Sequence, residues 1–132
     1  MEIRILLDHD LEEFDDYFEA GLRETGWDQD LTFIFKRLRD YGLPDDHPDQ
    51  EIWRFAQQQR LWLLTNNRNS DDDASLQATI KRENTPDSLP VITVSDKNKL
   101  VLAEYRQQAV NGLVEIVISP ERYGGTGRLF IP

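Results

Sequence analysis

Residues 2–11 read EIRILLDHDL, and this stretch decides the class of fold. Isoleucines and leucines make its first part, Glu2–Leu7, an almost continuous apolar run, which is typical of a strand buried on both faces. Strands of that kind lie inside parallel sheets that helices cover on both sides. We therefore expect a central strand at Glu2–Leu7, with acidic residues just beyond its carboxyl end.

Strand and helix patterns alternate along the rest of the chain. After a helix that Asp10 is expected to cap and Gly26 to end, the patterns predict strands at 31–35, 61–65 and 91–95, helices at 49–59, about 75–83 and about 99–119, and a short edge strand at 129–131. Parallel neighbours need crossover connections, so the alternation predicts a three-layer α/β/α fold with a mainly parallel central sheet. The length of 132 residues fits a single domain over residues 1–132.

Two segments permit alternatives. The charged stretch KRLRD at 36–40 fits a short helix as well as a continuation of the second strand. The stretch LVEIVIS at 113–119 is expected to end the last long helix, but its β-branched residues also suit a strand.

Composition narrows the functional classes. The chain has 25 acidic and 15 basic residues, a net charge of -10 that repels nucleic acid and anionic membranes. It has no cysteine, which excludes disulfides and thiolate zinc sites and fits a reducing, cytoplasmic location. No stretch approaches the roughly 20 apolar residues of a membrane span, so no membrane association is expected. With only His9 and His47 besides, a zinc site is not expected, and both imidazoles are predicted to lie at the surface.

Acidic and amide side chains follow three of the predicted strands. In open parallel sheets, ligands bind beyond the carboxyl ends of the strands, which here are Asp8–Asp10, Asn66–Asp73 and Ser95–Asp96. Mg²⁺ or Mn²⁺ takes about six oxygen ligands, of which one or two are protein carboxylates. Asp10 and Asp73 have helix capping as an alternative role, whereas Asp8 is expected to have none.

The strand exit EIRILLDHDL, the segment HPDQEIWRFAQQQ at 47–59 and the segment RLWLLTNNRN at 60–69 resemble short prokaryotic PIN-like proteins, including the Mut7-C-type group. The resemblance implies a PIN-like α/β/α domain in which strand-end acids hold Mg²⁺ or Mn²⁺ and hydrolyse RNA phosphodiesters. It also implies an endoribonuclease that in some relatives is the toxin of a toxin–antitoxin pair, with an antitoxin as protein partner.

The resemblance assigns roles to particular residues of this chain. Asp8 matches the acid of the first strand, and Asp49 or Glu51 matches the acid that opens the middle helix. Related chains often read T-x-D after the third strand, where this chain has Asn66, Asn67 and Asn69. An amide oxygen of Asn66 can still bind Mg²⁺, and Asp71, Asp72 or Asp73 can supply the missing carboxylate. Together with the residues that match the family, the expected catalytic set is Asp8, Asp49, Glu51 and Asp73, and the expected metal ligands are Asp8, Asp10, Asn66 and Asp73. Arg68, just past the third strand, is the expected contact to substrate phosphate, with a salt bridge to residues 71–73 as its alternative.

Two functions from different classes follow. The first is a PIN-like, Mg²⁺- or Mn²⁺-dependent ribonuclease that acts on RNA. The second is a catalytically weakened PIN-like module for protein–protein interaction, including homodimer formation. The amides of the NNRN segment and the net charge of -10 favour the second.

Overall fold

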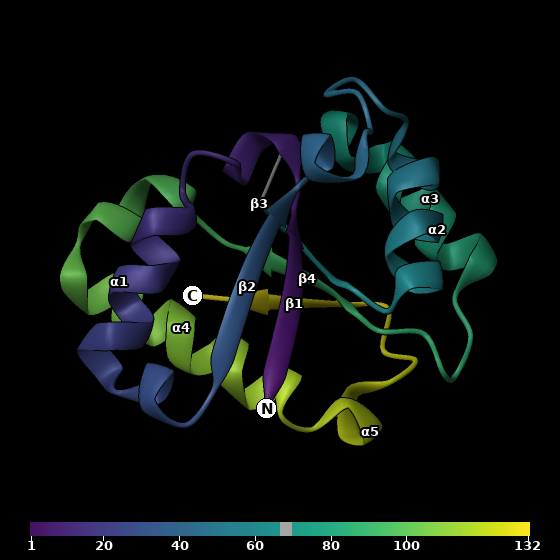
Figure 1. Ribbon diagram of the computed structural model, residues 1–132. Coiled ribbons are helices and arrows are strands. Elements are labelled where there is room, and N and C mark those ends of the chain that lie inside the picture. The colour runs from purple at the N-terminus through teal and green to yellow at the C-terminus, as the bar shows by residue number, and fades with distance from the viewer. Residues whose placement is uncertain (67–69) are drawn as a thin grey trace.

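The computed structural model describes residues 1–66 and 70–132, and for residues 70–73 it describes the backbone only. Strands and helices alternate as the sequence predicts (Figure 1). The strands are β1 (Glu2–Leu7), β2 (Thr32–Arg37), β3 (Trp62–Asn66), β4 (Val91–Val94) and β5 (Arg128–Ile131). The helices are α1 (Asp15–Thr25), α2 (Asp49–Gln59), α3 (Ser70–Glu83), α4 (Ala103–Val117) and α5 (Pro120–Tyr123), with 3-10 turns η1 (His9–Leu11), η2 (Trp27–Gln29), η3 (Leu38–Tyr41) and η4 (Lys97–Val101).

All five strands form one parallel sheet in the order β2-β1-β3-β4-β5. Within it, Leu7 of β1 lies opposite Arg37 of β2 on one side and Leu64 of β3 on the other. The chain builds the sheet outward in one direction from β1 and then in the other direction from β3. This doubly wound order has its topological switch point between β1 and β3, where such sheets open a crevice for ligands.

Helices cover both faces of the sheet, which confirms the predicted three-layer α/β/α architecture. Ile3, Ile5 and Leu7 pack on the α1 and α4 side, together with core residues of those helices such as Phe18 and Leu113. Leu6 points the other way and packs with α2 and α3, through residues that include Ile52, Trp53, Leu76 and Ile80. The continuous apolar run of β1 therefore has the predicted cause, burial on both faces.

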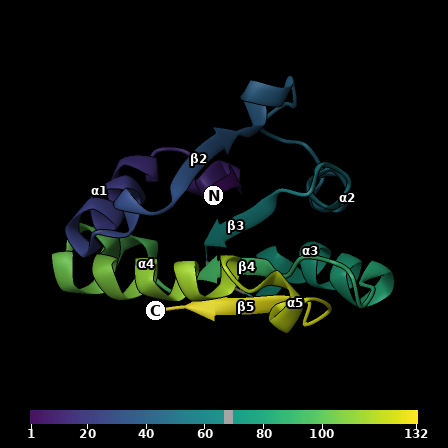
Figure 2. The same ribbon diagram turned by 60° about the horizontal axis from the view of Figure 1, so that its bottom comes forward.

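One crossover has an unusual hand. The steps from β3 to β4 and from β4 to β5 run the same way across the sheet, but α3 lies on one face and α4 on the other (Figures 1 and 2). Two crossovers that step in the same direction over opposite faces must have opposite hands. The crossovers through α1, α2 and α3 share one hand, and the crossover through α4 has the other. Since about 98% of such connections are right-handed, the crossover through α4 is a left-handed exception.

The contact between α1 and α4 accounts for the position of α4. A methyl group on Gly21 of α1 would lie 2.6 Å from Cγ2 of Val110, so only glycine lets the two helices approach this closely. Nearby, the Arg106 guanidinium donates to both carboxylate oxygens of Glu24, at 2.8 and 2.6 Å, and to the backbone carbonyls of Leu100 and Val101. One arginine thus joins α1, η4 and α4.

Several element boundaries differ from the sequence predictions. The first helix begins at Asp15 rather than directly after Asp10, because the turn η1 intervenes. Helix α3 begins at Ser70 rather than near Ser75, so residues 71–73 belong to a helix and not to a loop, and Asp73 is not its cap.

The structure also decides both sequence alternatives. The segment 113–117 is helical and is the last part of α4, where its apolar side chains are buried. Strand β2 continues to Arg37, and the rest of the KRLRD segment forms η3. In residues 1–66 and 70–132, no helix combines the length and apolar character needed to cross a membrane.

Substitution of Gly21 by alanine should destabilise the protein, although alanine is the better helix former by about 1 kcal/mol. The added methyl group overlaps Val110, and such overpacking costs about 1–3 kcal/mol. We expect Gly21→Ala to lower the free energy of unfolding in urea by about 1 kcal/mol. A variant as stable as the wild type would contradict the close contact of α1 and α4.

The Glu24–Arg106 pair should make stability depend on pH. Hydrogen bonding from Arg106 lowers the pKa of Glu24 below its ordinary value of 4.5. A lowered carboxyl pKa stabilises the fold above the unfolded-state value, and the contribution disappears as pH falls through the folded-state value. The difference in unfolding free energy between wild type and Glu24→Gln should therefore be constant from pH 7 to 5 and shrink below about pH 4.5. Glu19→Gln, an exposed change on the same helix, is the control; a pH-independent difference for Glu24→Gln would refute the assignment.

Candidate functional site

The carboxyl ends of β1 and β3 meet at the switch point. The backbone N–H of Asp8 donates to the carbonyl oxygen of Leu64 at 3.0 Å, which continues the β1–β3 pairing one residue beyond β1. Asp8 is 6% exposed and Asn66, the last residue of β3, is 7% exposed. Two polar side chains are thus buried where a doubly wound sheet binds its ligands. The carboxyl end of β1 lies at the upper end of Figure 1.

Asp8 also has a structural role. Its carboxylate accepts a hydrogen bond from the N–H of His9 at 2.9 Å and caps the turn η1. The expectation that Asp10 caps the following helix and that Asp8 has no such role is therefore wrong. The reason is that the chain turns at once into a 3-10 helix, and the residue that precedes this turn is Asp8.

A pocket of about 260 Å³ opens beside η1. Asp10, Glu12 and Glu13 make one side of it acidic, and Lys97 from η4 contributes a single ammonium group. The Lys97 ammonium donates to the carbonyl oxygen of Asp10 at 3.2 Å and lies 5.3 Å from the centre of the Phe14 ring. The pocket therefore combines carboxylates with one fixed cation, a combination that suits an ion and an anionic ligand together.

Two acids, Asp49 and Glu51, lie in the first turn of α2. The carboxylate of Glu51 accepts from Arg54 at 3.1 Å, and Arg54 holds the carboxylate of Glu83 with two bonds of 2.8 and 2.7 Å. These hydrogen bonds, which Arg54 donates and Glu83 accepts, lower the pKa of Glu83 and raise the pKa of Arg54. Glu51 thus takes part in the contact between α2 and α3.

The structure brings together a set of ligands that the sequence did not predict. Among the described residues, one group of three possible metal-binding side chains has all its ligand atoms within 4.8 Å of one another: His9, Glu12 and Asp45. Asp8, Asp49 and Glu51 do not form such a group. Residue Arg68 and the side chain of Asp73 lie outside the part of the chain that the structure describes.

A sequence signal for the observed group existed in part. His9 and Glu12 are three residues apart, a spacing that brings side chains together on a helical turn. The prediction that His9 lies at the surface is confirmed, because its side chain is half exposed. The sequence analysis did not predict that the carboxylates of Glu12 and Asp45 lie close to it. Asp45 comes from the loop between η3 and α2, and no spacing rule connects it to residue 9.

The acid after β4 is engaged in local structure. The carboxylate of Asp96 accepts from the N–H of Asn98 at 3.1 Å and caps η4, and its own N–H donates to the Tyr105 hydroxyl at 3.0 Å. Burial raises the pKa of Tyr105. These bonds fix the direction in which η4 leaves the sheet, and with it the position of Lys97.

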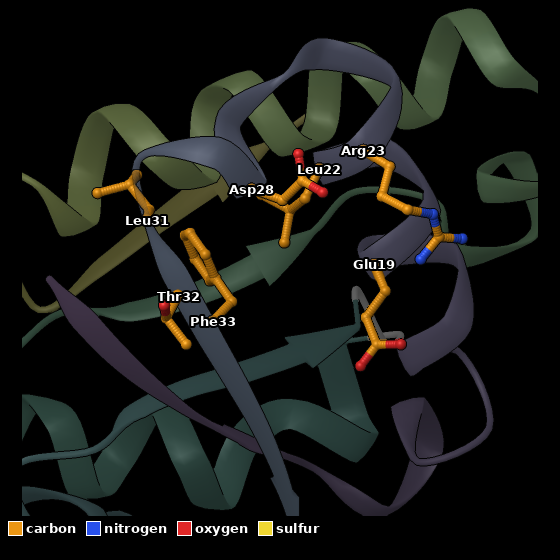
Figure 3. A pocket seen from close by; sticks show the side chains of 7 residues that line it. All are labelled: Glu19, Leu22, Arg23, Asp28, Leu31, Thr32 and Phe33. Carbon is orange, nitrogen blue, oxygen red and sulfur yellow. The ribbon is translucent and has the colours of Figure 1, made fainter.

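A second pocket lies at the amino end of β2 (Figure 3). It has a volume of about 250 Å³, and Glu19 and Arg23 of α1, Asp28 of η2 and the start of β2 line it. Thr32 is the first residue of β2, so this pocket is at the end of the sheet opposite to the carboxyl ends of the strands. Its position gives no reason to regard it as the ligand site of a doubly wound sheet.

Fold and site together define a class, the doubly wound α/β domains with acidic and amide side chains at the carboxyl ends of the central strands. No family model, curated protein or solved structure matches this chain.

Proposed function

We propose that this protein is a PIN-like ribonuclease that hydrolyses RNA phosphodiesters with Mg²⁺ or Mn²⁺ at the carboxyl ends of β1 and β3. The observation that carries the proposal is the burial of the Asp8 carboxylate at the switch point, beside Asn66. A carboxylate oxygen is a ligand that Mg²⁺ and Mn²⁺ prefer. This carboxylate lies at the end of the sheet where doubly wound domains bind their ligands, which supports the proposal.

The side chains around Asp8 suit such an ion. Asp8 and Asp10 supply the one or two carboxylates that Mg²⁺ takes from proteins, Asn66 supplies an amide oxygen, and water completes the shell. The ion would activate a water molecule and neutralise the scissile phosphate. Lys97, held at the pocket by Asp10 and Phe14, would face the phosphate as a further positive charge. A metal is also needed for the encounter, since the net charge of -10 otherwise repels RNA.

Loss of the Asp8 charge should abolish cleavage without loss of the fold. Asn caps helical turns as well as Asp does, so Asp8→Asn retains the hydrogen bond to His9 while it removes the negative charge. We expect the cleavage rate of end-labelled RNA with Mn²⁺ to drop by about 100-fold or more. The readout is product formation over time on a gel, for protein whose thermal unfolding midpoint matches the wild type.

The matched control is Asp87→Asn, the same change in an exposed residue between α3 and β4 at the opposite edge of the sheet. It should cleave at the wild-type rate. Wild-type protein that is folded but leaves single-stranded and structured RNA intact with either ion, or an Asp8→Asn variant as active as the control, would rule out the ribonuclease proposal.

A second candidate function is a PIN-like interaction module without catalysis, with an antitoxin-like protein or a second copy of the chain as partner. Two observations favour it: Glu51 is engaged with Arg54, and the residue at the end of β3 is an amide and not a carboxylate. A ligand that binds only the native state raises its stability, so an active metal site should raise the unfolding temperature in millimolar Mg²⁺ or Mn²⁺. An unchanged unfolding temperature would favour the interaction module.

A further inference from the structure

Three side chains converge beside the turn η1. His9 and Glu12 come from η1 and the residue after it, and Asp45 comes from the loop that leads from η3 to α2. The loop and the turn lie side by side at the upper end of Figure 1, and the contact between His9 and Asp45 joins them. One segment that precedes β2 in the sequence and one that follows it thus supply one imidazole nitrogen and two carboxylates.

The distances within this group are too long for hydrogen bonds. His9 Nδ1 lies 3.8 Å from Glu12 Oε2 and 3.6 Å from Asp45 Oδ1. Two ligands that each bind one ion at about 2.1 Å in tetrahedral geometry are separated by about 3.4 Å. The two separations from His9 exceed this value by a few tenths of an ångström, and all ligand atoms of the group lie within 4.8 Å of one another, so modest side-chain rotations would bring them to a shared ion.

Glu12 provides an independent indication of a ligand. It is 7% exposed, and its Oε1 atom is fully buried with no hydrogen-bond partner. A buried carboxylate oxygen without a partner is costly and rare in native proteins. The other oxygen of the same carboxylate, Oε2, lies 3.8 Å from His9 Nδ1, so an ion that both oxygens of Glu12 bind would also satisfy Oε1.

We propose that His9, Glu12 and Asp45 bind a divalent first-row transition-metal ion, with Zn²⁺ as the representative ion. An imidazole nitrogen with two carboxylates suits such ions, whereas Mg²⁺ prefers oxygen ligands and retains its water. Glu12 and His9 also line the pocket beside η1, which leaves open coordination positions for water. The proposal departs from the expectation, based on two histidines and no cysteine, that the chain has no zinc site.

This proposal concerns metal binding and does not depend on RNA hydrolysis. Its ligands are distinct from Asp8, which belongs to the proposed ribonuclease site. The two can therefore be tested separately with the same set of variants.

Zn²⁺ titration by calorimetry tests the proposal with the full chain without an affinity tag, so that no added histidines bind the metal. We expect one Zn²⁺ per chain, a signal that millimolar Mg²⁺ does not compete away, and binding at least about tenfold weaker in His9→Ala and Asp45→Asn. His9 and Asp45 are exposed enough for these changes to leave the fold intact. Glu12→Gln, which retains the shape of the buried side chain, should weaken binding in the same way.

The chain offers close controls. His47→Ala removes the other imidazole and Asp46→Asn changes the neighbouring acid, and both should bind Zn²⁺ as the wild type does. Asp8→Asn should also bind normally, because it retains the cap of η1. The proposal is overturned if wild-type protein does not bind Zn²⁺ at a single site, if His47→Ala weakens binding as much as His9→Ala, or if Asp8→Asn abolishes it.

Discussion

The parallel pairing of β1 with β3 is the constraint on which the site depends. Their pairing continues beyond β1 through the bond from the Asp8 N–H to the carbonyl of Leu64, so the chain leaves β1 directly above the exit of β3. The two strands belong to the two halves of a doubly wound sheet, and the helices that follow them leave on opposite faces. Asp8 and Asn66 are buried at these strand ends, where sheets of this kind bind their ligands.

Short turns decide which side chains reach the pocket beside η1. Asp8 caps η1 and Asp96 caps η4, and these turns present Glu12 and Lys97 to the same pocket. Some acids near the carboxyl ends of the strands therefore stabilise local structure, whereas others remain available to bind a ligand. Asp96 and Glu51 hold helices or turns in place, whereas Glu12 retains a buried oxygen without a partner.

Local pattern determined most of the fold. The apolar run of β1 predicted burial on both faces, and the alternation of periods predicted a parallel sheet between two helical layers, because these patterns depend on side-chain burial along each segment. Boundaries were less accurate: α1 starts later and α3 earlier than predicted, since residues at 8–14 and 70–74 suit caps, turns and helices alike. The hand of the α4 crossover was not predictable, since it depends on which face of the sheet α4 covers, and α4 packs there against α1, a helix far from it in sequence.

The sequence by itself determined the fold class, the central strand, and the fact that acids follow strand ends. Only the tertiary structure decided which acids meet. Asp45 approaches His9 because the loop after η3 lies beside the turn η1, and Arg54 reaches Glu83 because α2 packs on α3. Contacts of this kind join residues far apart in the chain, and their geometry depends on how whole helices and loops pack. The spacing of residues within one segment carries no information about that packing.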